Sequence, residues 1–74
     1  MDVEVRLFAG FRTGRFKKRT FDLPEGTPLR SVIVQLEIPE QDVSLPLVNG
    51  EYSKLERQLV ADDVISLFPA VGGG

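Results

Sequence analysis

LPEGTP, residues 23–28, is the stretch that decides how the chain folds, because it separates a strand pattern from a helix pattern. Pro24 and Gly26 stop an extended segment. Thr27 is expected to cap the first free amides of a helix, and Pro28 has the fixed φ that suits a first turn. The stretch therefore predicts a junction at which a strand ends and a helix begins.

The segment after this junction has the apolar spacing of a helix. Apolar residues follow at i, i+3, i+4 and i+7, which places them on one face of a helix of about ten residues. Pro39 ends the pattern, and the run of β-branched residues at 32–34 is a poor helix former by itself. Packing against a sheet must therefore stabilise this helix. The residues of the apolar stripe are Leu29, Val32, Ile33 and Leu36.

Four segments have strand patterns: residues 2–8, about 16–23, 43–48 and 64–68. The first alternates strictly between apolar and polar side chains, which is typical of a half-buried strand. Asn49-Gly50 predicts a tight turn after the third, since both residues accept a positive φ. The side chains expected to face inward are Val3, Val5, Leu7, Leu45, Leu47, Ile65 and Leu67.

The remaining segments complete the order strand, strand, helix, strand, short element, strand. Residues 52–59 fit either a short helical turn or an irregular edge, and residues 61–63 form a polar turn. One helix on one face of a small mixed sheet is an α+β roll. We expect one domain over residues 1–69, with Pro69 ending the last strand, and a flexible glycine-rich tail over residues 70–74.

The composition narrows the function classes. The chain has 74 residues, a net charge of −2 and no cysteine, which is typical of one small soluble domain without disulfides. That charge predicts no binding to nucleic acid, and no apolar run is long enough to span a membrane. The start of the chain does not have the pattern of a signal peptide, so we expect a cytoplasmic protein. Five of the nine basic residues nevertheless lie together, at Arg12, Arg15, Lys17, Lys18 and Arg19.

We expect no catalysis by the side chains of this protein. It has no histidine, cysteine or tryptophan, so it has no usual general base, no thiol nucleophile and no common metal ligand set. The end of the chain, Gly72-Gly73-Gly74, has two interpretations. Glycine at a terminus is conformationally free, which fits a frayed end. Alternatively, these three glycines, which have no side chains, can enter the active site of a partner enzyme, where the carboxylate of Gly74 would react.

Four stretches in this order carry a resemblance to a known family. They are Val5-Arg6-Leu7-Phe8-Ala9, Leu23-Pro24-Glu25-Gly26-Thr27, Val48-Asn49-Gly50-Glu51, and residues 59–74 with their terminal glycines. Together they resemble the β-grasp sulfur carriers, which include the small subunit of molybdopterin synthase and the thiamine-pathway carrier. One departure lies at residues 61–63, Ala-Asp-Asp, where the family usually has a glycine between two acids.

The resemblance implies a β-grasp (ubiquitin-like) roll, with a mixed sheet of four to five strands and one main helix packed on one face. It also implies a protein cosubstrate without a bound cofactor. An E1-like adenylating enzyme would use ATP to activate the carboxylate of Gly74, and sulfur would replace the adenylate to give a thiocarboxylate. Gly73 and Gly74 would form the tail pair, with Gly72 adding reach. The acceptor would be the molybdopterin synthase large subunit, slightly favoured, or thiazole synthase.

Partner binding must come from the body of the domain. In a β-grasp sheet the first and last strands are neighbours, so Phe8 and Phe68 are expected on the face opposite the helix, with Val48 nearby. Such aromatics are candidate interface anchors or a small second cluster. Arg15, Lys17 and Lys18 can meet an acidic partner, or can simply be a solvated loop. A ubiquitin-like modifier joined through Gly74 and a plain β-grasp binding module remain alternatives.

Overall fold

The computed structural model describes residues 1–70, and the elements below belong to that part of the chain. It contains five strands, one α-helix and two short 3-10 helices. In chain order these are β1 (Asp2–Leu7), η1 (Ala9–Arg12), β2 (Lys18–Asp22), α1 (Leu29–Gln35), η2 (Glu40–Asp42), β3 (Val43–Val48), β4 (Glu51–Tyr52) and β5 (Val64–Pro69).

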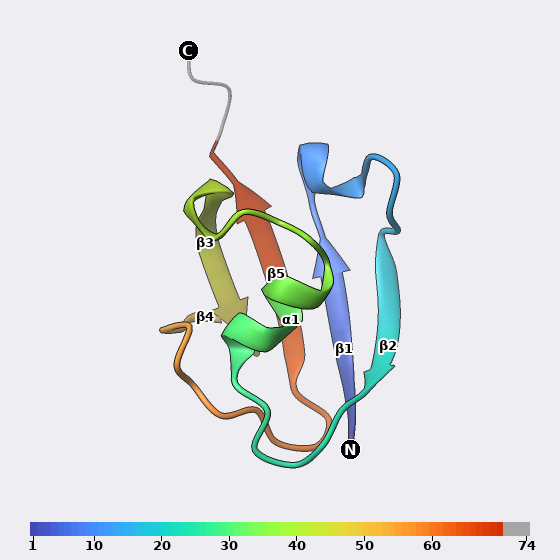
Figure 1. Ribbon diagram of the computed structural model, residues 1–74, viewed down its shortest axis with the longest axis vertical. Coiled ribbons are helices and arrows are strands. Elements are labelled where there is room, and N and C mark those ends of the chain that lie inside the picture. The colour runs from blue at the N-terminus through green and yellow to red at the C-terminus, as the bar shows by residue number, and fades with distance from the viewer. Residues whose placement is uncertain (71–74) are drawn as a thin grey trace.

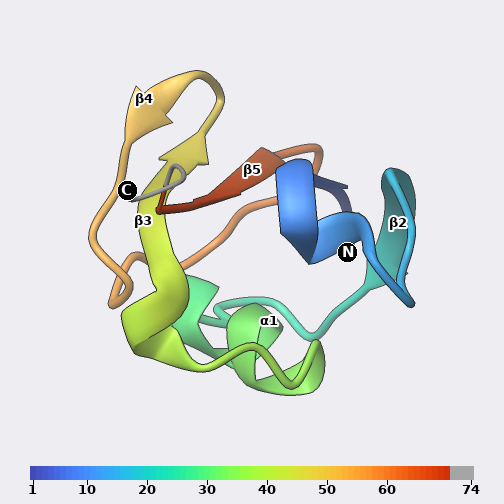
Figure 2. The same cartoon turned by 90° about the horizontal axis from the view of Figure 1, so that it is seen from above.

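The five strands form one mixed sheet in the order β2-β1-β5-β3-β4. β1 and β5 lie side by side and parallel, and the other neighbours are antiparallel. α1 packs on one face of the sheet, and the opposite face carries no helix within residues 1–70 (Figures 1 and 2). This is the expected α+β roll, with five strands and one main helix.

The core lies between α1 and the two central strands. Val5 pairs with Ile65 and Leu7 with Leu67, and all four side chains are fully buried. Burying an aliphatic side chain of this size contributes about 1.5–3 kcal/mol. The inward orientation expected for the first and last strands is therefore confirmed. The helix contributes Leu29, Val32 and Ile33 to the same core.

The start of α1 differs from the prediction. Thr27 does not cap the helix, because its hydroxyl donates to the carbonyl of Pro24 at 2.6 Å, and Pro28 is itself the N-cap residue. The first helical amides find other acceptors, since Leu29 donates to the carbonyl of Arg57 and Arg30 to that of Leu55, each at 2.9 Å. The loop after β4 thus satisfies the amides that a capping side chain would have satisfied.

The end of α1 also differs, because the helix has seven residues instead of about ten. It closes in a Schellman motif. The amide of Ile38 donates to the carbonyl of Ile33 at 3.2 Å, and the amide of Glu37 donates to that of Val34 at 3.0 Å. Glu37 has a φ of 57°, and the chain leaves the helix there, before Pro39.

The expected inward face of β3 is wrong. Leu45 is 40% exposed, and Leu47 lies on the same side, whereas Pro46 and Val48 are buried. Pro46 pairs with Leu67 and Val48 with Ile65, and directly paired residues share a face of a sheet. An irregularity between Val43 and Leu45 shifts the register of β3 against β5. Both alternating sets of β3 contain apolar residues, with Ser44 the one polar member, so the alternation alone does not determine which set faces the core; the pairing with β5 does.

Candidate functional site

β5 runs through the middle of the sheet and ends at the same end of the molecule as η1 (Figure 1). Pro69 closes the strand and Ala70 is the last described residue. The tail predicted for residues 70–74 therefore lies almost entirely outside the described residues, as do Gly72, Gly73 and Gly74. The structure does describe the surface from which this segment departs.

Two aromatic rings stack beside that point, on the face opposite α1. The rings of Phe8 and Phe68 have centroids 4.1 Å apart and an angle of 9° between their planes. The amide of Phe8 donates to the carbonyl of Leu67 at 3.2 Å, which continues the pairing of β1 with β5. The guanidinium of Arg12 lies over the ring of Phe8, 5.2 Å from its centroid. The predicted position of the two phenylalanines on the open face is confirmed.

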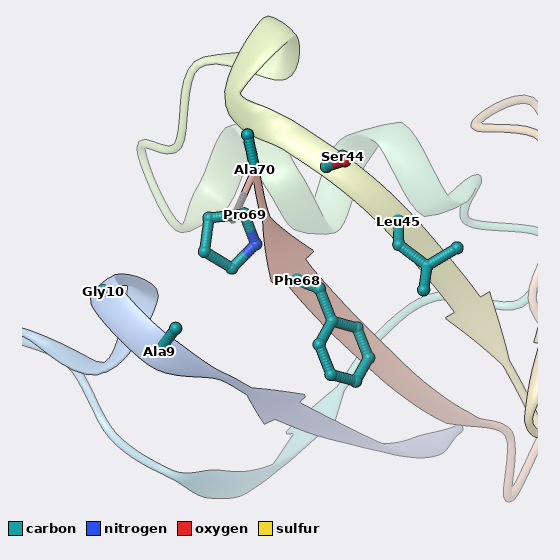
Figure 3. Close-up of a pocket in the computed structure, with 7 residues that line it drawn as sticks. All are labelled: Ala9, Gly10, Ser44, Leu45, Phe68, Pro69 and Ala70. Carbon is teal, nitrogen blue, oxygen red and sulfur yellow. The ribbon is translucent and has the colours of Figure 1, made fainter. Parts of the chain in front are cut away.

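An apolar depression of about 540 Å³ adjoins the Phe68 ring. Leu45 pairs with Phe68 across β3 and β5, and the two side chains lie on the same side of the sheet (Figure 3). Ala9 lies across from them on η1. The residues that line the depression are Ala9, Gly10, Ser44, Leu45, Phe68, Pro69 and Ala70.

The apolar surface continues onto β4. Leu47 pairs with Tyr52, and Tyr52 is 67% exposed. The resulting surface, here called the open-face patch, consists of Phe8, Leu45, Leu47, Tyr52 and Phe68. Exposed aromatic and aliphatic side chains gathered on one face are typical of a protein-binding surface. The sequence predicts inward positions for Leu45 and Leu47 and no role for Tyr52, so all three members of the patch are known only from the structure. The Asn49-Gly50 turn could have indicated that Tyr52 lies beside Leu47.

Val48 does not belong to this patch. Its side chain is 1% exposed and packs in the core beneath the sheet, so the prediction that it lies near Phe8 and Phe68 on the open face is wrong. The cause is the β3 register already described. Val48 instead supports the patch from the core side of the sheet, because it pairs with Ile65 of β5.

The three predicted basic residues occupy different environments. Arg15 is fixed to the backbone, since its guanidinium donates to the carbonyls of Leu36 at 3.1 Å and Phe11 at 3.2 Å. It borders a second depression, of about 450 Å³, which Pro69 and Ala70 also line. Lys17 and Lys18 are exposed at the start of β2 and make no ion pair within residues 1–70. The structure thus separates Arg15, near the end of β5, from the two lysines.

The described residues hold no group of acids suited to a metal ion. The pKa shifts that the structure gives belong to Arg30 and Glu56, which form an ion pair between α1 and the loop after β4. Neither residue belongs to the open-face patch. Among residues 1–70, the longest helix is α1, and none is long and apolar enough to cross a membrane. The geometry therefore describes an exposed apolar surface beside the end of a central strand.

Comparison with known proteins identifies the family. The ThiS family profile matches residues 5–74. The chain belongs to the ThiS family. No curated protein sequence matches this ThiS-family chain significantly.

Solved structures share the fold over its whole length. A putative molybdopterin converting factor subunit 1 from Pyrococcus furiosus is 30% identical, with a TM-score of 0.78 over 96% of this chain and 99% of that one. A chain from the complex of subunits 1 and 2 of the Helicobacter pylori molybdopterin-converting factor is 27% identical, with a TM-score of 0.65 and full coverage of both chains.

A third solved structure shares the fold at lower sequence identity. Small archaeal modifier protein 1 from Haloferax volcanii is 22% identical, with a TM-score of 0.76 over 95% of this chain and 98% of that one, and this likeness concerns the fold alone. The family match and the molybdopterin converting factor structures together support a small carrier protein of the β-grasp fold.

Proposed function

We propose that this ThiS-family protein is a sulfur carrier whose reactive group is the carboxylate of Gly74. The observation that carries the proposal is the position of the open-face patch, directly beside the end of β5, where the chain continues into Gly72-Gly73-Gly74. A partner that binds the patch would hold the domain at the base of the glycine segment. Three glycines without side chains can then enter a narrow active site.

The chemistry follows from the weak reactivity of a carboxylate. An oxygen of the Gly74 carboxylate would attack the α-phosphorus of ATP in an E1-like adenylating enzyme, releasing pyrophosphate and giving an acyl-adenylate. A hydrosulfide ion from a sulfide source would then attack the acyl carbon and AMP would leave, which gives the thiocarboxylate at Gly74. The chain has no histidine and no cysteine, and in this proposal the activating enzyme supplies the catalysis.

The open-face patch and the basic segment would have different parts in binding. Phe8 and Phe68 are preorganised by their stacking, so ordering them on binding costs little entropy. The positive charge between Arg12 and Arg19 would mainly raise the rate of encounter with an acidic partner. Phe8, Phe68, Arg15, Lys17 and Lys18 are thus the residues that we propose for partner binding, with Leu45, Leu47 and Tyr52 added from the structure.

The sulfur acceptor that we propose is a molybdopterin synthase large subunit. Two of the similar structures are described as molybdopterin converting factor proteins, and one of them is a complex of subunits 1 and 2. Thiazole synthase is the competing acceptor, since the matching family bears the name ThiS. Mixing the thiocarboxylated protein with each purified acceptor enzyme, and measuring which one removes the sulfur, distinguishes the two pathways.

Intact-mass measurement tests the carrier function itself. The protein is incubated with ATP, a sulfide source and a candidate activating enzyme, and loading appears as the exchange of one oxygen for sulfur at Gly74. Gly74→Phe should lose this exchange while the domain stays folded. Gln35→Phe is the matched control, because it adds the same ring at an exposed residue of α1 and should load normally. Full loading of Gly74→Phe would contradict the proposal.

A second candidate function is that of a protein modifier, because the fold is similar to that of small archaeal modifier protein 1. As a modifier, the protein would form an isopeptide bond between Gly74 and a lysine of a target. Covalent species of higher mass in cells, which disappear in the Gly74→Phe variant, would favour the modifier over the sulfur carrier.

A further inference from the structure

β2 is a free edge of the sheet. It pairs on one side with β1, and no element of the described residues lies along its other side (Figures 1 and 2). The register is regular over five residue pairs, without a bulge or a proline. An exposed, regular edge strand presents a row of unpaired amides and carbonyls, which is a template for adding another strand. β4, at the other edge, has only two residues.

The register shows which backbone groups face outward. The amide of Leu7 donates to the carbonyl of Lys17 at 2.9 Å, and the amide of Leu23 donates to that of Met1 at 2.8 Å. In an antiparallel pair the bonded positions alternate, so the residues of β2 with odd numbers bond to β1. The amides and carbonyls of Lys18, Thr20 and Asp22 therefore point away from the sheet.

The charge along this edge selects what can add to it. Lys17, Lys18 and Arg19 lie in sequence at one end of the strand and are exposed. At the other end, the carboxylate of Asp22 forms an ion pair with the N-terminal amine, at a distance of 3.4 Å. Two copies of β2 aligned in register in parallel would bring these like charges together, which disfavours that pairing. A strand with carboxylates opposite residues 17–19 would instead be attracted.

The helix side of the edge offers apolar contact as well. Phe16 and Phe21 are half-buried, with ring centroids 5.9 Å apart, and both pack against the core. The guanidinium of Arg19 lies 4.4 Å from the centroid of the Phe16 ring. A side chain on the helix side of an added strand would lie beside Phe21, toward the Asp22 end. The edge thus has an apolar end and a basic end.

We propose that β2 binds an extended acidic segment of a partner protein by strand addition. The segment runs antiparallel to β2, with apolar residues opposite Phe21 and acids opposite Lys17, Lys18 and Arg19. The outward amides and carbonyls supply backbone hydrogen bonds, and the charges supply selectivity. This site is separate from the open-face patch and does not depend on the chemistry of Gly74.

A peptide titration followed by NMR tests the proposal. The probe is the capped peptide Val-Ile-Val-Ile-Asp-Glu-Asp-Glu, and the controls are its reversed sequence and a version with lysines in place of the acids. Binding by strand addition should slow hydrogen exchange at the amides of Lys18, Thr20 and Asp22. The amides of Arg19 and Phe21 should change far less, because they already bond to β1. A purely electrostatic contact would not produce this alternation.

Two variants separate the backbone contribution from the charge contribution. Thr20→Pro removes one outward amide and leaves the bonds to β1 in place, so the affinity should fall by roughly tenfold while the spectrum stays that of a folded domain. The double variant Lys17→Glu, Lys18→Glu should lower the affinity for the acidic peptide by at least a similar factor. Lys54→Glu is the matched control, because it changes an exposed lysine outside β2 and should bind the peptide almost normally.

Three results would overturn the proposal. The first is an acidic peptide that does not bind at millimolar concentration. The second is a folded Thr20→Pro variant that binds as tightly as the native protein. The third is a set of NMR chemical-shift changes confined to the open-face patch, which would show that the peptide binds there. None of these results depends on sulfur loading, so a failure here leaves the proposed carrier function standing.

Discussion

Several residues of this protein have the left-handed backbone conformation that favours glycine, although their sequence positions hold other residues. Within residues 1–70, four non-glycine residues have a positive φ: Ala9 at 50°, Glu37 at 57°, Asn49 at 53° and Asp62 at 71°. Asparagine and aspartate tolerate this region, but alanine and glutamate pay a steric cost of about 1–2 kcal/mol. Asp62 lies at the position where the β-grasp sulfur carriers usually have a glycine between two acids. Glu37 is the clearest case, because it occupies the glycine position of a Schellman motif.

Glu37→Gly should stabilise the protein by roughly 1 kcal/mol, since glycine adopts the observed φ without a Cβ clash. The side chain of Glu37 is exposed and makes no ion pair among the described residues, so little is lost. Urea unfolding measures the change in free energy. Gln35→Gly, two residues earlier in the last helical turn, should instead destabilise by about 1 kcal/mol. Equal effects of the two substitutions would contradict this explanation.

A buried carboxylate is the second feature at the scale of residues. Asp63 is 3% exposed, and its oxygens accept from the side-chain amide of Asn49 at 2.9 Å and from the amide of Val60 at 2.8 Å. The side-chain oxygen of Asn49 in turn accepts from the amide of Val64 at 2.9 Å. Asn49 and Asp63 therefore join the turn after β3 to the start of β5.

Asp63→Ala should destabilise the protein by roughly 1–3 kcal/mol, because it removes a buried carboxylate that accepts hydrogen bonds from Asn49 and Val60. Thermal or urea unfolding checks this value. Asp2→Ala removes an exposed carboxylate that makes no side-chain ion pair in the described structure, so it should change the stability by less than about 0.5 kcal/mol. A neutral Asp63→Ala variant would show that water replaces the carboxylate.

At the scale of elements, Arg30 connects α1 to two other segments. Its guanidinium donates to Glu40 of η2 at 2.7 Å and to Glu56 of the loop after β4 at 3.2 Å. The hydrogen bonds that Arg30 donates to Glu40, and then to Glu56, raise the pKa of Arg30. The pKa of Glu56 is lowered, first by its own backbone amide and then by Arg30. This network supports a helix of only seven residues, which is too short to be stable alone.

The lowered pKa of Glu56 predicts a pH dependence. Its ionised form is favoured in the folded state, so its contribution is present above the ordinary glutamate pKa and is lost as the pH falls through the lowered value. Native protein and Glu56→Gln should therefore differ slightly in stability near neutral pH and converge in acid. Melting temperatures measured over this range check the convergence. The difference should be small and should shrink in high salt, because both partners are exposed.

At the scale of the whole molecule, the fold places the open-face patch at the end of its central strand. The stacked pair of Phe8 and Phe68 is formed only because β1 and β5, the first and last strands, are parallel neighbours. The opposite face of the sheet is covered by α1, so a partner can reach this pair only from the open face (Figure 2).

Phe68→Ala should reduce the kcat/KM for sulfur loading by at least about tenfold, as expected for an aromatic anchor at the centre of a binding surface. The loss of the stacked pair should also cost about 0.5–1.5 kcal/mol of stability beyond the buried area. Val34→Ala truncates another exposed apolar residue, on α1, and should load at the native rate. Circular dichroism shows whether both variants are folded. Normal loading of Phe68→Ala would place the partner elsewhere.

Part of this site could be predicted from the sequence. The strict alternation of β1 identified Val5 as buried and Phe8 as lying on the other face. The same reasoning failed in β3, where Leu45 and Val48 exchanged places relative to the prediction. It also gave no indication that Asp63 is buried, because it predicted only a polar turn at residues 61–63. These errors fall where the local sequence is compatible with two environments.

The sequence by itself determined the one-helix α+β roll, the junction at residues 23–28 and the lack of any histidine or cysteine for catalysis. Those features depend on local patterns and on residue types. Only the tertiary structure decided the register of β3 against β5, the acceptors for the first amides of α1 and the burial of Asp63. Each of these depends on a contact between segments distant in sequence, and such a contact can override a local preference by satisfying the same hydrogen bonds or burying more apolar area.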